Sequence, residues 1–342
     1  MGTDAAYSIG SGPHTHWLAL PATERMCTML YLEAFSKVLP VLLLFGLGAA
    51  FRRNGFLQPI AVDGLKKLIV NVSLPAVLFL AFAAVDLQPE HLLVAGMVFL
   101  ACTTVLFAGR RLHGIAGTRS PYLPPLLTGF EAGMMGYAIF TAVYGAENVF
   151  KFAVVDLGQV IFVFFILVPY VQRQGMGAVA FGQTVRGFLV TPVILSIFAG
   201  ILFNRLGLMP LVTSFPLTAA VITTLELLAA VTTPLIGIVI GYEVNLGRTG
   251  LAAPTRTLAV RLAIWVTLGL LFTTLVISRL FPGDTVAQAA LMTLFVLPPP
   301  FVIPLFMAQA GAEDQRYVVN TLSLATLATL AAFTAVSVIF PA

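Results

Sequence analysis

Long runs of apolar residues follow one another along the chain, with short polar or basic segments between them. A helix needs about 20 apolar residues to cross a bilayer. We expect such helices at about residues 34–51, 65–85, 92–109, 122–143, 152–171, 187–204, 217–241, 259–278, 286–310 and 318–340. The pattern therefore predicts an all-α membrane protein with about ten transmembrane helices.

Two segments lie outside this pattern. Residues 1–33 contain Gly, Ser and His and lack the order of a signal peptide, in which a basic segment precedes an apolar one. We expect a disordered N-terminal tail there. Residues 172–186 separate the first five runs from the last five, and we expect them to form a cytoplasmic connecting loop. The two halves are then 34–171 and 187–342.

The two halves share residues that a common apolar composition does not explain. When residues 40–55 are aligned with residues 192–207, the shared positions include Pro40/Pro192, Gly48/Gly200, Arg53/Arg205 and Gly55/Gly207. Repetition at a fixed spacing is typical of repeat architectures. Because each half has an odd number of spans, the second half enters the membrane upside down. This predicts an inverted-topology repeat.

The basic residues predict the orientation of the chain. With the N-terminus outside, all but five of the 18 lysines and arginines fall in segments on the inner side, and Arg261 is counted among them. The exceptions are Arg25, Lys37, Lys151, Arg205 and Arg279. Because cytoplasmic loops carry an excess of Lys and Arg, we expect both termini outside, in a multi-pass protein of the cell (inner or plasma) membrane.

The composition supports a membrane protein and excludes other classes. Of the 342 residues, 59% are hydrophobic and 9% are charged, whereas soluble domains carry about 25% charged residues. The net charge of +4 reflects short basic loops, so we expect lipid and not nucleic acid as a partner. The sequence has no H-E-x-x-H, G-x-S-x-G or P-loop motif. We therefore expect no enzyme, catalytic residue, metal or cofactor.

Two predicted spans carry residues that an uninterrupted apolar helix avoids. The fourth places a carboxylate among glycines, with the candidate site residues Glu131, Gly133, Gly136 and Tyr137. The ninth has a run of prolines and a polar end, with the candidate residues Pro298, Pro299, Pro300, Pro304 and Gln309. Proline removes a backbone donor, so we expect breaks at one depth near the membrane centre. Secondary transporters bind their solutes between broken helices of this kind.

The carboxylate of Glu131 is the first candidate for chemistry, because an ionisable group inside a membrane is costly and usually functional. We interpret it as a site that takes up a proton on one side and releases it on the other. The alternative is a protonated glutamate that only bonds a neighbouring backbone carbonyl. The positive N-terminal ends of the broken helices would favour an anion nearby.

A second set of polar residues lies in the fifth and tenth spans. Asp156 and Gln159 share a helix face, and Asn320 and Ser323 have the same spacing in the matching span of the second half. These residues predict an ion or solute pocket. Asp156 is expected only about 8 Å deep at 1.5 Å per residue, so the alternative is an interfacial acid that water reaches from outside.

Several short motifs resemble the auxin efflux carrier family, which includes plant auxin exporters and bacterial malonate and malate permease homologues. They are SLPAVLF at 73–79, GMMG at 133–136, TP at 191–192, TTPLIG at 232–237 and the proline run that ends in QAG at 309–311. The resemblance covers residues 34–340. It implies two inverted five-helix repeats in a fold similar to bile-acid/sodium symporters, with a scaffold domain, a transport domain and crossing fourth and ninth helices.

Two positions depart from the family pattern. The family usually has Asn two residues before the first glycine of its G-x-x-G motif, where this chain has Glu131. The proline that follows the motif in the family is replaced here by Tyr137 and Ala138. An acid in a pocket for anions conflicts with direct carriage of a carboxylate unless Glu131 is protonated during loading.

We therefore expect a secondary transporter, or permease, that moves a small organic anion by alternating access with proton coupling. The anion would be an auxin-, malonate- or malate-like carboxylate. A sodium-coupled symporter stays open as the alternative, with Na⁺ held by backbone carbonyls of both broken spans, Glu131 and Gln309. An intramembrane enzyme or a non-transporting receptor fits the sequence less well. The substrate, the direction of transport and the oligomeric state, including a homodimer, stay open.

Overall fold

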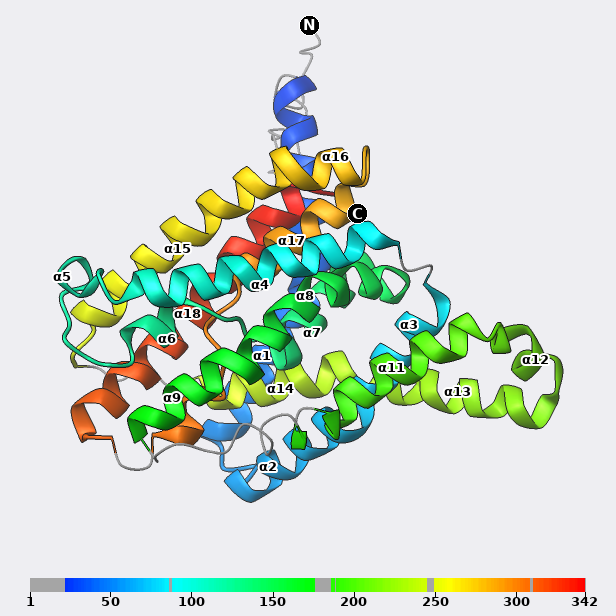
Figure 1. Cartoon of the computed structure of the whole chain (residues 1–342), viewed down its shortest axis with the longest axis horizontal. Helices are drawn as coiled ribbons and strands as arrows, with labels where there is room; N and C mark the ends of the chain where they lie inside the picture. Colours follow the sequence, from blue (N-terminus) through cyan, green and yellow to red (C-terminus); the bar gives the residue numbers. More distant parts are fainter. Residues whose placement is uncertain are drawn as a thin grey trace, which may run out of the picture.

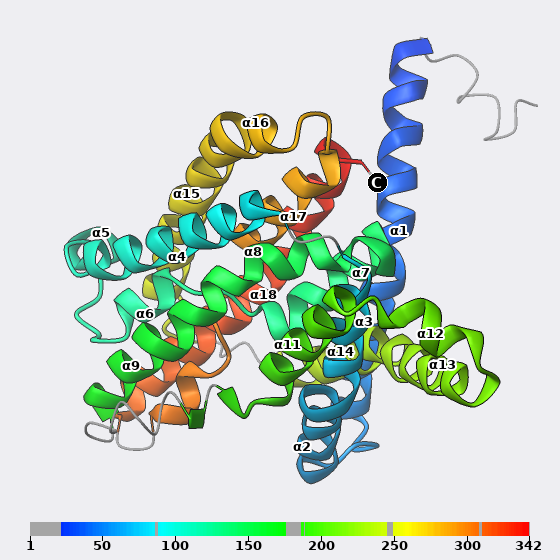
Figure 2. The same cartoon turned by 45° about the vertical axis from the view of Figure 1, so that its right-hand side comes forward.

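The computed structural model describes residues 22–85, 88–175, 186–187, 189–244, 249–307 and 310–341, except for the side chains of residues 22–35 and 37. These residues form helices and connecting turns without a strand, so the predicted all-α class is confirmed for this part of the chain. Figures 1 and 2 show the helices from two directions.

The elements of the first half are α1 (Ala22–Arg53), α2 (Pro59–Leu68), η2 (Ile69–Ser73), α3 (Leu74–Ala84), α4 (Pro89–Gly109), α5 (His113–Ala116), α6 (Leu123–Leu127), η3 (Ala132–Gly136), α7 (Tyr137–Tyr144), η4 (Ala146–Asn148), α8 (Val149–Phe162), η5 (Val163–Leu167) and α9 (Val168–Gly175). Those of the second half are α11 (Pro192–Arg205), α12 (Leu208–Ser214), α13 (Pro216–Ala230), α14 (Thr232–Glu243), α15 (Ala252–Phe272), η6 (Thr273–Ile277), α16 (Ser278–Leu280), α17 (Thr285–Val296), η7 (Ile303–Phe306) and α18 (Ala312–Ile339).

Several of these helices are long and apolar enough to cross a membrane. Among the described residues there are seven such spans: Pro59–Ala84, Pro89–Gly109, Leu123–Tyr144, Ala146–Gln174, Pro216–Glu243, Ala252–Leu280 and Ala312–Ile339. An eighth is added if α11 and α12, which meet at an angle of 87°, count as one span. The chain is therefore an integral, multi-pass membrane protein. The predicted ninth span is represented by the shorter helix α17.

The outward-facing side chains agree with a lipid environment. Large apolar residues are exposed on α4, α11, α13 and α15, and Leu217 on α13 is 88% exposed. Apolar surface of this extent is rare on soluble monomers and marks a membrane or partner surface.

Helix α1 starts earlier than the hydrophobic pattern predicts. It begins at Ala22, so residues 22–33 are helical and the predicted disordered tail is too long. The apolar pattern begins only near residue 34, and a helix can extend beyond the apolar part of its sequence. The predicted tail residues 1–21 lie outside the described part of the chain.

The helices form two groups. The α1 group contains α1, α2, η2, α3 and α11–α14, in which α1 packs on α14 and α11 packs on α3. The α4 group contains α4–α9, α15–α18 and the short segments η3–η7, with close pairs α4–α8, α8–α17 and α15–α18. Figure 2 shows the α1 group on the right. The groups meet mainly where α7 packs on α1 and α14, where α18 packs on α1, and where α3 packs on α8.

Two glycines that match in the sequence alignment occupy matching places in the α1 group. Gly48 of α1 lies against the backbone of Ile238 and Tyr242 in α14, and Gly200 of α11 lies against the backbone of Phe79 in α3. A Cβ at Gly48 would overlap the Ile238 carbonyl, and one at Gly200 would lie 2.7 Å from the Phe79 carbonyl oxygen. Small residues of this kind let membrane helices approach closely.

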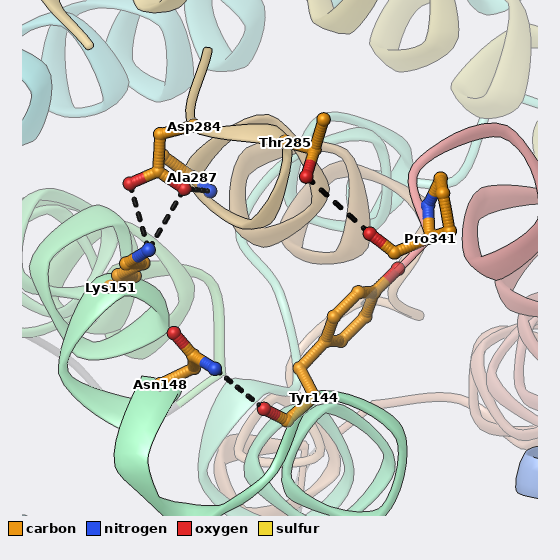
Figure 3. Close-up of polar contacts among 7 residues, drawn as sticks. All are labelled: Tyr144, Asn148, Lys151, Asp284, Thr285, Ala287 and Pro341. Carbon is orange, nitrogen blue, oxygen red and sulfur yellow. Dashed lines mark hydrogen bonds and ion pairs between the residues drawn. The ribbon is translucent and has the colours of Figure 1, made fainter.

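Polar contacts tie the α4 group together at one end. Figure 3 shows Lys151 at the start of α8 bound to both carboxylate oxygens of Asp284, at 2.8 and 2.7 Å. Asp284 also caps α17 by accepting from the Ala287 N–H at 2.9 Å. The end of α7 is fixed nearby, because the Tyr144 hydroxyl donates to the Phe340 carbonyl at 2.8 Å. This end holds the starts of α8 and α17 in register.

We expect the substitution Gly48→Val to destabilise the protein, because the added side chain has to push α1 away from α14. Overpacking of this kind costs about 1–3 kcal/mol. The measurement is the melting temperature of the purified, detergent-solubilised chain. Gly46→Val is the matched control, because no atom lies within 4 Å of the Cβ position at Gly46 in the same helix. Equal melting temperatures for the two variants would contradict the close α1–α14 contact.

Candidate functional site

The fourth predicted span is interrupted after a short helix. Helix α6 ends at Leu127, because Thr128 is extended and Gly129 has a φ of +66°, a conformation that suits glycine. The Thr128 hydroxyl donates to the Cys102 carbonyl at 2.9 Å and fixes the break to α4. The helix resumes as η3 at Ala132. The predicted break near Glu131 is therefore confirmed.

The ninth predicted span breaks at its prolines. Helix α17 ends where Leu297 becomes extended, with ψ of 154°. Pro298, Pro299 and Pro300 have no backbone N–H, so they cannot continue the helical hydrogen bonds. A short turn of helix, η7, follows with Pro304 in its first turn. The predicted break is confirmed here too.

The two breaks lie against each other, and we call this contact between residues 128–131 and 297–301 the crossing. The N–H of Glu131 donates to the Pro298 carbonyl at 2.9 Å, and the N–H of Phe301 donates to Glu131 Oε2 at 2.6 Å. From α8, the side-chain amide of Gln159 bonds both the carbonyl and the N–H of Phe130, at 3.0 and 3.3 Å. Backbone groups freed by the breaks thus find protein partners, as a bilayer interior requires.

On one side of the crossing, Arg261 of α15 binds the C-terminal ends of α6 and α17. Its guanidinium donates to the carbonyls of Leu126 at 3.0 Å, Gly129 at 2.6 Å and Leu297 at 3.0 Å. It also lies 5.0 Å from the ring centroid of Phe130, within range of a cation–π contact. The C-terminal end of a helix carries partial negative charge. One buried cation therefore hydrogen-bonds the negative C-terminal ends of two helices.

The placement of Arg261 corrects the sequence-based assignment, which counted it with the basic residues of the inner side. Its side chain is 1% exposed and lies at the crossing. Trp265, one turn further along α15, donates its Nε1–H to the Leu127 carbonyl at 2.7 Å. The signal that sequence reasoning missed is an arginine and a tryptophan at i and i+4 within an apolar run, which places both on one helix face.

On the opposite side of the crossing, Glu131 binds the N-terminal ends of the two segments that continue the broken spans. Its Oε1 accepts from the Met134 N–H of η3 at 3.2 Å, and its Oε2 accepts from the Phe301 N–H just before η7. N-terminal ends are positive, so they stabilise the carboxylate. The carboxyl group of Glu131 therefore occupies the N–H groups of Met134 and Phe301 at these ends.

Asp156 lies in a second polar cluster next to the crossing. Its Oδ2 accepts from the Tyr137 hydroxyl at 2.9 Å, and its Oδ1 accepts from the Gln159 amide at 3.1 Å. The alternative of an interfacial acid solvated from outside does not describe it, because Asp156 is 3% exposed and hydrogen-bonds to Tyr137 and Gln159 within the protein. Gln159 joins the two clusters, since it bonds both Asp156 and Phe130.

A cavity of about 780 Å³ lies beside the crossing, between the two helix groups. The α1 group contributes Asn71, Val193 and Glu243 to its wall, and the α4 group contributes the crossing, α8 and α18. Most of the predicted site residues line it: Glu131, Gly133, Tyr137, Asp156, Gln159, Pro300, Pro304 and Ser323. The structure therefore brings residues of four predicted spans together around one space.

Other predicted site residues lie elsewhere. Gly136 packs against Phe152 and Leu297, and Pro298 and Pro299 form the break without lining the cavity. Asn320 does not line the cavity, and its amide donates to the Thr249 carbonyl at 3.2 Å. The predicted residue Gln309 lies outside the described residues.

Sequence reasoning also missed an ion pair on the cavity wall. Lys66 of α2 pairs with Glu243 at the end of α14, and the Arg52 guanidinium of α1 donates to the Tyr242 carbonyl at 3.3 Å beside it. Residues in three helices of the α1 group are therefore linked at this wall. In the described ranges, no three His, Cys, Asp or Glu side chains gather in a way that holds a metal.

A comparison of the chain with protein-family models and with curated proteins finds no match.

We expect the substitution Gly129→Ala to destabilise the crossing. An L residue in the left-handed region costs about 1–2 kcal/mol, and the added Cβ would lie 2.8 Å from Pro300 Cγ. The measurement is the melting temperature in detergent. Gly133→Ala is the control, because its Cβ would meet only Leu74 Cδ2 at 3.9 Å. If Gly133→Ala lowers the melting temperature as much, the tight contact at Gly129 is wrong.

Proposed function

We propose that the chain is a secondary active transporter that moves a small organic anion across the membrane by alternating access, with a proton as the coupling ion. The observation that carries this proposal is Glu131. Its carboxylate is held by the backbone N–H groups of Met134 and Phe301 at the point where two broken spans meet, and it lines the cavity.

The two halves of the chain are inverted repeats in this proposal, with both termini outside the cell membrane. The matched glycines support the repeat, because Gly48 and Gly200 make equivalent close contacts in the pairs α1–α14 and α11–α3. The two breaks support it as well, since α6–η3 and α17–η7 occupy matching places in the two halves. The location of the cavity between the helix groups supports alternating access, because relative movement of the groups would open it to one side at a time.

Glu131 couples the proton to the solute through competition for the same donors. While Glu131 is ionised, its carboxylate occupies the N–H groups of Met134 and Phe301. When it takes up a proton it loses its negative charge, and these N–H groups become available to a solute carboxylate. The site then holds one negative charge in either state, from Glu131 or from the solute. A proton therefore moves together with each anion.

The cavity wall favours an anion with an apolar body. The charged residues of its lining are Glu131, Asp156, Lys66 and Glu243, and most of the remaining wall is aliphatic or aromatic. Among the described residues of the lining, Lys66 is the only cation for a second carboxylate on the solute, and it is already paired. An auxin-like monocarboxylate therefore fits this wall better than malate or malonate.

We expect an inward proton gradient to drive uptake of a labelled carboxylate into vesicles that contain the purified chain. The assay compares indole-3-acetate with malonate and malate, and we expect the largest uptake for the first. Glu131→Gln should remove the stimulation by the gradient, because glutamine has no proton to exchange. Glu313→Gln, an exposed residue at the start of α18, is the control. Full gradient-driven uptake by Glu131→Gln would contradict the proton role.

We expect the substitution Val193→Trp to block transport while the protein remains folded, because Val193 of α11 lines the cavity. Uptake in vesicles and the elution profile in detergent are measured together. Leu195→Trp in the same helix is the control, since Leu195 is 52% exposed on the outer surface. Unchanged uptake by a folded Val193→Trp protein would place the solute path elsewhere.

A further inference from the structure

The crossing presents a group of backbone carbonyls that resembles an ion-binding site. The carbonyls of Leu126, Gly129 and Leu297 come from the C-terminal ends of α6 and α17 and converge on one point. In secondary transporters, carbonyls at the ends of broken helices coordinate the coupling Na⁺. In this chain the point on which they converge is occupied by the guanidinium of Arg261.

We propose that Arg261 is a built-in cation that replaces Na⁺ at the crossing, so that the chain neither binds nor requires Na⁺ there. For transport, this inference rests on the proposed function. As a statement about ion binding, it stands on the geometry of the crossing alone.

Arg261 and neighbouring side chains occupy the carbonyls that a sodium ion would need. Its Nη2 bonds one carbonyl from each broken span, Gly129 at 2.6 Å and Leu297 at 3.0 Å. The neighbouring carbonyl of Leu127 is bonded by Trp265, and that of Val296 by the Thr329 hydroxyl at 2.6 Å. Five carbonyls at the two helix ends are therefore already engaged by side chains, namely those of Leu126, Leu127, Gly129, Val296 and Leu297.

Burial and charge lead to the same conclusion. Arg261 is 1% exposed, and the face of Phe130 covers it at 5.0 Å, so an ion cannot enter unless the guanidinium leaves. A second cation beside the guanidinium would be repelled by it at short range. The two charges at the crossing are thus Arg261 on the negative helix ends and Glu131 on the positive ones. Of these two, only Glu131 lines the cavity.

This arrangement separates two roles that Na⁺ combines in sodium-coupled transporters. Arg261 holds the two broken spans together permanently and acts as a positioning residue. The exchangeable cation is then the proton on Glu131. The alternative of Na⁺ coupling through the carbonyls of both breaks is incompatible with this assignment.

The test measures cation binding by the purified full-length chain in detergent, with no transport assay. Its melting temperature is compared in NaCl and in choline chloride at equal ionic strength, and binding of radioactive Na⁺ is measured alongside. We expect the wild-type chain to show no difference in melting temperature and no saturable Na⁺ binding. Saturable stabilisation of the wild type by Na⁺ would overturn the proposal.

A substitution tests whether the carbonyls form a cation site. Arg261→Met should lower the melting temperature in choline by several degrees, and NaCl should restore part of the loss, because the carbonyls are then open to an ion. Arg256→Met, at an exposed position of the same helix, should show neither effect. An Arg261→Met protein that folds but does not respond to Na⁺ contradicts the proposal.

If Arg261→Met does not fold, Arg261→Lys serves in its place, because it keeps a positive charge near the carbonyls. We expect this variant to resemble the wild type in its indifference to Na⁺, and Na⁺-dependent stabilisation would overturn the tethered-cation assignment. Failure of the proposed transport function would appear differently. The chain would show no solute uptake in vesicles, while its melting temperature would still be the same in NaCl and in choline chloride.

Discussion

The hydrogen-bonding requirement of interrupted backbone inside a membrane organises this molecule. Each break in a helix frees donors on one side and acceptors on the other, and an unsatisfied group in hydrocarbon costs several kcal/mol. The chain places two breaks against each other and adds a charge of each sign. Arg261 receives the carbonyl ends of α6 and α17, and Glu131 receives the N–H ends of the segments that follow. The surrounding helices hold these two charges in place.

The α1 group is a closely packed set of helices that lies next to the crossing. Its helix pairs approach closely at Gly48 and Gly200, whereas the α4 group contains both breaks and is tied at one end by Lys151 and Asp284. The cavity lies between the groups, so its walls belong to two sets of helices that are each packed within themselves. In the proposed transport cycle, the two groups would move relative to each other while the hydrogen bonds inside the crossing stay covered.

Much of this arrangement can be predicted from the sequence where a residue type forces a local conformation. Prolines 298–300 cannot continue a helix. In the fourth span, the carboxylate of Glu131 stands among glycines, a combination that an uninterrupted apolar helix avoids. Both breaks were therefore predictable. The approximate positions of the membrane-spanning helices were predictable from the lengths of the apolar runs. The start of α1 was not, because the helix continues beyond its apolar part, to Ala22.

Arg261 and Asp156 show what local patterns leave out. A count of basic residues treats every arginine as a surface charge, but three carbonyls far away in the sequence draw Arg261 inward. The depth of Asp156 was judged from its distance to the end of a run, although its burial depends on Tyr137 and Gln159. The carbonyls bound by Arg261 and the Tyr137 hydroxyl bound by Asp156 are brought into place by tertiary packing, which a short stretch of sequence does not reveal.

In the proposed mechanism, the carboxylate of Glu131 and that of the solute compete for the same two backbone donors, the N–H groups of Met134 and Phe301. The most direct test measures protons during binding, with a pH indicator in a weakly buffered solution of the purified chain to which the transported carboxylate is added. We expect the wild-type chain to take up one proton for each anion bound, and we expect no proton uptake with Glu131→Gln. Binding of the anion to the wild-type chain without proton uptake would contradict it.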